Sequence, residues 1–243
     1  MGGVAYPSRL EQAVQWFLRH WLLLFNVVWG AYVLAPFTAP VFMNQGMTTA
    51  ATVVYAVYST QCHQLPERSY FLFGDKISYS IGEIDTARGS DNNQMFELRK
   101  FIGTQQMGWK VAWSDRMISL WGAIWLASLA YAALRNRGPR HISVGLLLLL
   151  LLPLAVDGSS HFVADILRPL GSGFRDSNDW LRQLTGDIFS PAFYRGDALG
   201  SFNSLMRLVT GVLAGAGIAG MVLPLLDGML GTAPQPHTSR RMP

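Results

Sequence analysis

The sequence from Trp21 to Pro66 reads WLLLFNVVWGAYVLAPFTAPVFMNQGMTTAATVVYAVYSTQCHQLP and contains no Lys, Arg, Asp or Glu. An uncharged run of this length is typical of a chain that enters a lipid bilayer, because a charged side chain is costly in hydrocarbon. The run is too long for one crossing, and Pro36, Pro40 and the turn-forming Asn44-Gln45-Gly46 interrupt it. We therefore expect two membrane spans here, joined by a tight turn.

Three more apolar runs follow toward the C-terminus. Met117–Leu134 and Leu208–Leu226 are each about one bilayer long in helical rise, and His141–Val156 contains seven consecutive leucines. Half of the 243 residues are hydrophobic and only 14% are charged, which indicates a membrane protein rather than a soluble enzyme. The sequence predicts five transmembrane helices, at roughly 18–40, 47–63, 116–135, 141–158 and 207–227.

These spans define the expected fold class, an all-α polytopic membrane helical bundle with two long loops, 64–115 and 159–206, on one face. We expect one integral membrane domain over residues 1–230 and a disordered tail at 231–243. The second loop is rich in aromatic residues, so we expect it to form a lid on the bundle. The first apolar segment lacks a small-residue cleavage site, so we expect no removable signal peptide.

Basic residues near the span ends predict the orientation of this multi-pass protein in a cell membrane. The connection 135–140 contains three arginines, and the tail ends in Arg240-Arg241. The positive-inside rule places both segments in the cytoplasm and, with five spans, the N-terminus outside. Arg9 and Arg19 argue against an outside N-terminus.

Ionisable side chains lie at four of the expected helix ends, and all four ends emerge on the same face. Guanidinium groups bind phosphates and carboxylates well, so such a group of side chains can hold an anion or a lipid head group. An interfacial ion pair that fixes the loop explains the same residues equally well. The expected polar cluster consists of His63, Glu67, Arg68, Arg116, Asp157 and Arg207.

Cys62-His63 also permits a metal site, because thiolate and imidazole both bind zinc and similar ions. Pro66 favours a helix end just before it, which would let these neighbouring side chains turn toward one ion. His161 is a candidate third ligand, but further ligands are scattered along the chain. A buried thiol beside a histidine bonded to the backbone is the simpler interpretation. The single cysteine excludes an internal disulfide.

The sequence also contains an internal echo. Asn178, Arg182, Thr185 and Gly186 recur with the same spacing at Asn203, Arg207, Thr210 and Gly211. Four matched positions do not distinguish a true repeat from chance similarity.

In three places the chain resembles a family of small multi-pass prokaryotic membrane proteins known as domain of unknown function 2085. These are the motif Cys-His-Gln-x-Pro-x-Arg-Ser at Cys62–Ser69, Asp157-Gly158 after an apolar helix, and Arg-x-x-Thr-Gly at Arg207–Gly211. A second family motif, Cys-x-Arg-Cys-x-Gly-x-Tyr, keeps its arginine here as Arg116, but Ser114 and Met117 replace both cysteines. The resemblance implies no established activity, and the lost cysteines put a metal or redox role in doubt.

We expect an integral membrane protein whose partner at the polar cluster is membrane lipid. No nucleic acid is expected, because basic residues next to span ends account for the net charge of +4. The alternative is a membrane enzyme acting on a phosphorylated or isoprenoid lipid, with His63 or Asp157 as base. A transporter fits less well, because the charges gather at one face rather than at the midplane. The sequence leaves protein partners open and, beyond that metal ion, the cofactor as well.

Overall fold

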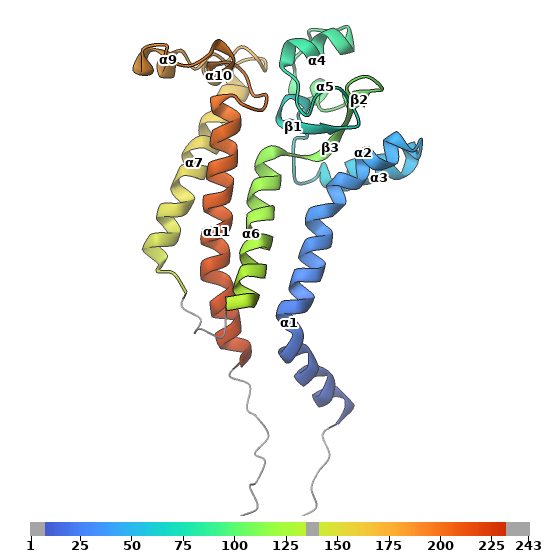
Figure 1. Cartoon of the computed structure of the whole chain (residues 1–243), viewed down its shortest axis with the longest axis vertical. Helices are drawn as coiled ribbons and strands as arrows, with labels where there is room; N and C mark the ends of the chain where they lie inside the picture. Colours follow the sequence, from blue (N-terminus) through green and yellow to red (C-terminus); the bar gives the residue numbers. More distant parts are fainter. Residues whose placement is uncertain (1–7, 135–140, 232–243) are drawn as a thin grey trace, which may run out of the picture.

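A computed structural model describes residues 8–134 and 141–231. Figure 1 shows long helices in the lower part of the molecule and a cap of short elements at their upper end. In chain order the elements are α1 (Arg9–Leu34), η1 (Ala35–Phe37), α2 (Thr38–Asn44), α3 (Thr48–Tyr58), η2 (Pro66–Arg68), β1 (Ser69–Leu72), α4 (Ile81–Arg88), α5 (Met95–Leu98), β2 (Gly103–Thr104), β3 (Gly108–Ser114), α6 (Asp115–Leu134), α7 (Val144–Leu167), α8 (Phe174–Ser177), α9 (Asp179–Thr185), α10 (Pro191–Tyr194) and α11 (Phe202–Gly231).

Four helical segments of the described chain are long and apolar enough to cross a membrane. The protein is therefore mostly helical, with several candidate spans, but the expected five spans are wrong. The expected second span, 47–63, contains only the 11-residue α3, which is too short to cross a bilayer and packs back against α2. The four candidate spans are Arg9–Asn44, Asp115–Leu134, Val144–Leu167 and Phe202–Leu230.

The two prolines do not end the first helical segment where the sequence predicted. Pro36 lies in the first turn of η1 and Pro40 in the first turn of α2, where a backbone N–H is not needed for an intrahelical bond. The chain therefore continues to Asn44 and turns only near Gly46, whose φ is +75°. Figure 1 shows the hairpin of α2 and α3 at the level where the cap meets the long helices.

The C-terminal helix α11 is the centre of the bundle. It packs against α6 and α7, and α6 also packs against α1. Gly215 allows the close approach of α11 to α6, because a Cβ atom there would lie 2.4 Å from the carbonyl oxygen of Leu120. Gly211 has the same role one turn earlier, where a Cβ atom would overlap Ser119. Small residues are usual where membrane helices cross closely.

The cap contains a three-stranded antiparallel sheet in the order β1-β3-β2, so the all-α expectation is wrong in this part. β3 leads directly into α6. Val111, Ala112 and Trp113 are completely buried in succession, so the strand lacks the alternation that would have revealed it. Trp113 packs against Tyr32 and Tyr58 in the core.

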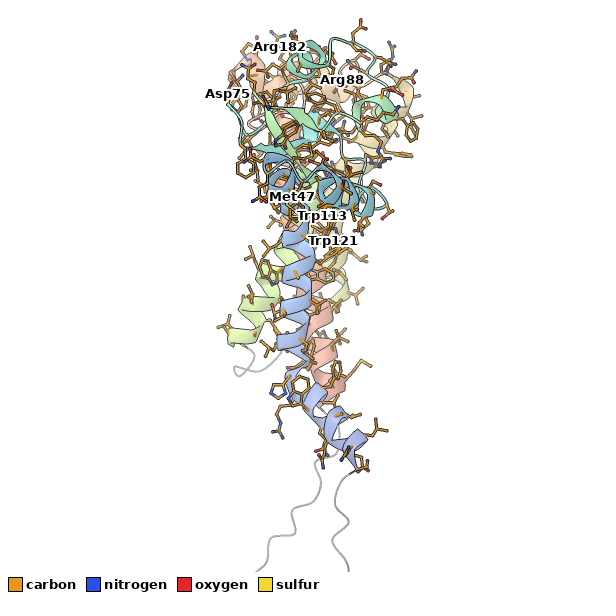
Figure 2. The ribbon with its side chains drawn as sticks, turned by 90° about the vertical axis from the view of Figure 1, so that its right-hand side faces the viewer. Met47, Asp75, Arg88, Trp113, Trp121 and Arg182 are labelled. Carbon is orange, nitrogen blue, oxygen red and sulfur yellow. The ribbon has the colours of Figure 1, made fainter. Side chains whose placement is uncertain are left out.

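The second long loop is shorter than expected, because α7 continues through Gly158 as far as Leu167. Residues 168–201, here called the lid, contain α8, α9 and α10. Figure 1 shows α9 and α10 at the top of the molecule, projecting to the side above α7. Figure 2 shows Met47, Trp113 and Trp121 near the junction with the long helices, and Arg182 at the opposite, upper side of the cap.

Two polar levels bound the apolar part of α11. Arg207 and Asp227 are twenty residues apart on this helix, which is about 30 Å of helical rise and matches the hydrocarbon thickness of a bilayer. At the lower level, Asp227 accepts hydrogen bonds from the Trp21 indole and the Tyr131 hydroxyl. The upper level lies directly beneath the cap and carries the polar cluster described next.

Candidate functional site

Arg207, near the start of α11, is buried among carboxylates. Its Nε donates to both oxygens of Asp115, at 2.8 and 2.9 Å, and its Nη1 donates to Asp197 Oδ1 at 2.5 Å. Its Nη2 donates to the backbone oxygen of Asp197 at 2.6 Å. The guanidinium thus ties α11 to the first residue of α6 and to the lid.

Arg68, in η2 of the cap, binds the other side of Asp197. Its Nε donates to Asp197 Oδ2 at 2.7 Å, and its Nη1 and Nη2 form a fork on Asp165 at 2.7 and 2.9 Å. Burial alone would raise the pKa of Asp197, but Arg68 and Arg207 hold it well below its ordinary value. The carboxylate therefore stays ionised and links the cap, the lid and α11.

A second group of charges centres on Asp157 of α7. Arg116 Nη2 donates to Asp157 Oδ2 and Arg175 Nη2 donates to Oδ1, both at 2.7 Å. Nη2 of Arg175 also lies 3.2 Å from His161 Nε2, which must act as the acceptor because a guanidinium has only donors. Both carboxylate oxygens of Asp157 are thus occupied by arginine.

A pocket of about 300 Å³ lies beside these two groups, between the turn after α3, the start of α6 and the upper part of α7. Its wall is partly cationic and partly apolar, which suits a ligand with an anionic end and an apolar remainder. The lining residues are Gln61, Cys62, His63, Gln64, Leu65, Arg68, Met95, Ser114, Arg116, Met117, Gly158, His161, Phe162, Asp165 and Arg207.

The structure brings most of the expected polar cluster to this pocket. His63, Arg68, Arg116 and Arg207 line it, whereas Asp157 lies behind Arg116. His63 lies at the mouth of the pocket and is partly exposed to solvent. Burial of the rest of its side chain, together with the nearby Arg68, lowers its pKa.

Glu67 does not line the pocket but is buried behind it. Neither of its carboxylate oxygens has a hydrogen-bond partner within the described chain. Burial raises the pKa of Glu67 to about 7. The nearby Lys110, also completely buried, donates to the backbone oxygens of Gln64 and Arg99 instead.

The three expected metal ligands, Cys62, His63 and His161, share the pocket wall. Across residues 8–134 and 141–231, however, no group of three or more His, Cys, Asp or Glu side chains is arranged to hold a metal ion. The Cys62 thiol instead donates to Ser114 Oγ at 3.5 Å. Ser114 stands where the resembling family has a cysteine, so the geometry gives the metal hypothesis no support.

Four residues of the network were not part of the predicted cluster. Asp115 directly precedes Arg116 in the sequence, and Asp165 lies in the part of α7 that the sequence assigned to a loop. Arg175 and Asp197 lie in the lid, where charged residues are usually solvated. Their signal was charge balance: the predicted cluster had more arginines than carboxylates, and buried arginines require acidic partners.

The two copies of the internal echo lie in different environments. Asn178 and Asn203 do meet, and both donate to the backbone oxygen of Arg175, at 2.6 and 2.7 Å. Arg182, however, pairs with Asp187 on the surface, whereas Arg207 is buried. The matched positions therefore do not form two equivalent sites.

Comparisons with known proteins also indicate a membrane protein. The chain is 24% identical over 185 residues to Uncharacterized protein MJ1492 of Methanocaldococcus jannaschii, a match that covers 73% of this chain and 91% of the relative. No solved structure matches the chain. Residues 104–195, which include Arg116, Asp157 and Arg175, match the model of a family described as "Predicted membrane protein (DUF2085)". Over this segment the chain is similar to the DUF2085 family of predicted membrane proteins.

Proposed function

We propose that this membrane protein binds the anionic head group of a membrane lipid in the pocket between α3, α6 and α7. The observation that carries the proposal is Arg116. Its Nη2 is engaged by Asp157, but within the described chain its Nε and Nη1 have no partner, and the side chain is 19% exposed on the pocket wall. A guanidinium with two unused donors is well suited to a phosphate oxygen.

The other arginines form the frame of the site. All side-chain nitrogen atoms of Arg68 and Arg207 already donate hydrogen bonds, and the acceptors are Asp165, Asp115 and Asp197. Four arginines and four aspartates make the network electrically balanced without a ligand. Arg116, assisted by His63 at the mouth, therefore supplies the contact to the anion, while the remaining charges hold the walls in place.

The position of the pocket favours a lipid over a soluble anion. It lies at the upper polar level, where the hydrocarbon of a bilayer would end, and Phe162 on its rim is 58% exposed. Above and below Phe162, the exposed face of α7 is apolar from Val144 to Leu167 apart from Ser159. An acyl or isoprenoid chain has room beside this rim while the head group reaches Arg116.

The test measures lipid occupancy by native mass spectrometry after purification in a mild detergent. We expect wild type to retain a bound anionic phospholipid and Arg116→Ala to lose at least about tenfold in affinity, as for a lost charge-assisted contact. Asp157 keeps Arg175 in this variant, so the fold should survive. The matched control is Arg182→Ala, which removes an exposed, paired arginine.

Equal lipid occupancy in wild type and Arg116→Ala would overturn the proposal. A second arm titrates inorganic phosphate into the lipid-free protein. Binding of phosphate with the same dependence on Arg116, without retention of lipid, would identify a soluble anion as the ligand.

Catalysis on a phosphorylated or isoprenoid lipid is the second candidate. His63 favours it, since this side chain is exposed at the pocket mouth and its lowered pKa keeps it neutral and able to accept a proton. Asp157 is a poor base, because arginines occupy both its oxygens. Turnover of a bound lipid that stops in His63→Gln, with binding intact, would establish this function.

A further inference from the structure

The lid carries large apolar side chains that no described part of the chain covers. Trp180 and Leu184 of α9 are 46% and 78% exposed, and Ile188, four residues further, is 73% exposed. This spacing of four places the first two on one side of the helix. Single exposed apolar residues are ordinary on a protein surface, but a stripe of this kind usually marks a contact.

Arg182 of α9 lies on the other side of the helix. Arg182 is two positions from both Trp180 and Leu184, which is roughly 200° around the helix. It pairs with Asp187, and Figure 2 places it at the top of the cap, farthest from the long helices. The apolar stripe must then point down, toward the level at which the membrane begins.

The underside of the lid adjoins the lipid-facing surface of α7. A hollow of about 580 Å³ is lined by Phe174 and Trp180 from the lid and by Val156 and Ser160 from α7. Val156 immediately precedes Asp157, so the tryptophan reaches close to the upper polar level. Figure 1 shows α9 above and to the side of α7, where it overhangs the space that lipid would occupy.

We propose that the underside of the lid is seated in the head-group region of the bilayer, with Trp180, Leu184 and Ile188 inserted at the boundary of the acyl chains. A helix with one polar and one exposed apolar side lies in this way at an interface, and tryptophan is enriched there. The continuity of the lid with the apolar face of α7 favours lipid over a protein partner.

Spin labels on single cysteines test this placement. Cys62 is the only cysteine, so Cys62→Ser gives a cysteine-free background. Leu184→Cys places the label on the stripe, and Arg182→Cys, on the opposite side of the same helix, is the matched control. The proteins are reconstituted in phosphatidylcholine–phosphatidylglycerol vesicles, and collision rates with oxygen and with a water-soluble nickel complex are measured. Each variant must match wild type in thermal unfolding.

The label at 184 should give a several-fold higher ratio of oxygen to nickel collisions than the label at 182. Ile188→Cys is the second variant, and the same result is expected for it. A label at 184 that is as open to the nickel complex as the label at 182 would show that the lid stands in water. Shielding from both reagents would indicate a protein contact, and either outcome overturns the proposal. Neither label touches the pocket, so the result is independent of head-group binding at Arg116.

Discussion

The buried carboxyl group of Glu67 makes the stability of the protein depend on pH. Burial raises its pKa from 4.5 to about 7 in the folded protein. Between these values the unfolded chain releases a proton that the folded protein retains, so the free energy of unfolding falls as the pH rises, by roughly 3 kcal/mol in all. Lys110 and Arg68 lie near it, but both donate to other acceptors.

Glu67→Gln should remove this dependence, because the amide stays neutral at every pH. We expect the melting temperature of the variant, relative to that of wild type, to increase as the pH rises from 4.5 to 7.5. Glu97→Gln, at a partly exposed carboxylate paired with Lys100, is the control and should not change the profile. A constant difference between Glu67→Gln and wild type across this range would contradict the raised pKa.

Gln64 holds the turn after α3 in place. Its backbone has a φ of +54°, uncommon outside glycine, and its side-chain amide donates to the backbone oxygens of Tyr55 and Ala112, both at 2.9 Å. Gln64→Glu replaces the donor with a buried carboxylate, so the oxygens of Tyr55 and Ala112 both lose this hydrogen bond, while the Tyr55 oxygen keeps another, from the Ser59 N–H. We expect a loss of about 2–4 kcal/mol in the free energy of unfolding.

Thermal unfolding in detergent measures this loss, and Gln45→Glu at an exposed turn is the matched control. Should both variants melt together with wild type, the amide would have no structural role. The motif Cys62–Ser69 thus combines two kinds of residue: Gln64 and Arg68 build the turn and the network, whereas His63 remains open to the pocket.

At this scale the sequence predicted the cationic half of the site better than the acidic half. An arginine beside an uncharged run is conspicuous, because a membrane span accounts for the apolar residues around it but not for the arginine. Asp197 lies in a polar loop, where nothing in its neighbours distinguishes it from a solvated residue. Only the folding of the lid over α11 brings it to Arg68 and Arg207.

Among the elements, the close contact between α6 and α11 allows the packing of the bundle to be tested. A side chain at Gly215 would meet the Leu120 carbonyl oxygen at 2.4 Å and the Ala123 Cβ at 2.8 Å. Because one neighbour is backbone, the helices must separate to admit it. Gly215→Val should therefore lower the melting temperature sharply, at a cost of several kcal/mol typical of overpacking.

Ala216→Val also introduces a valine, at the next, exposed position of α11, and should change stability by less than about 1 kcal/mol. Comparable melting temperatures for the two variants would show that α6 and α11 do not pack through Gly215. The comparison also separates packing from any effect of valine on the helix itself.

The long helices were predictable because hydropathy and length suffice to identify them. The number of spans was not, since the uncharged run 21–66 contains enough residues for two crossings. Whether this run crosses once or twice depends on where the chain turns. The prolines in the first turns of η1 and α2 do not end the helical segment there. The sheet was missed because β3 is buried along its length and joined without a break to α6.

For the whole molecule, four spans remove the conflict that five spans created. The lower ends of α1 and α11 lie at the same end of the bundle (Figure 1), so the expectation that the N-terminus and C-terminus face opposite sides is wrong. Arg9 and Arg19 belong to α1, and in the sequence three arginines follow α6 and Arg240-Arg241 follows α11. The cap carries the pocket at the other end.

The positive-inside rule then predicts one consistent orientation, with both termini in the cytoplasm and the cap outside. We expect a fluorescent protein fused after the C-terminus to be active and an alkaline phosphatase fused there to be inactive, since the phosphatase requires export. A cysteine placed at Arg88, at the top of the cap in Figure 2, should react in intact cells with a reagent that does not cross membranes. An active C-terminal phosphatase together with an unreactive cap would contradict this orientation, and the lipid proposed to bind at Arg116 would then belong to the cytoplasmic leaflet.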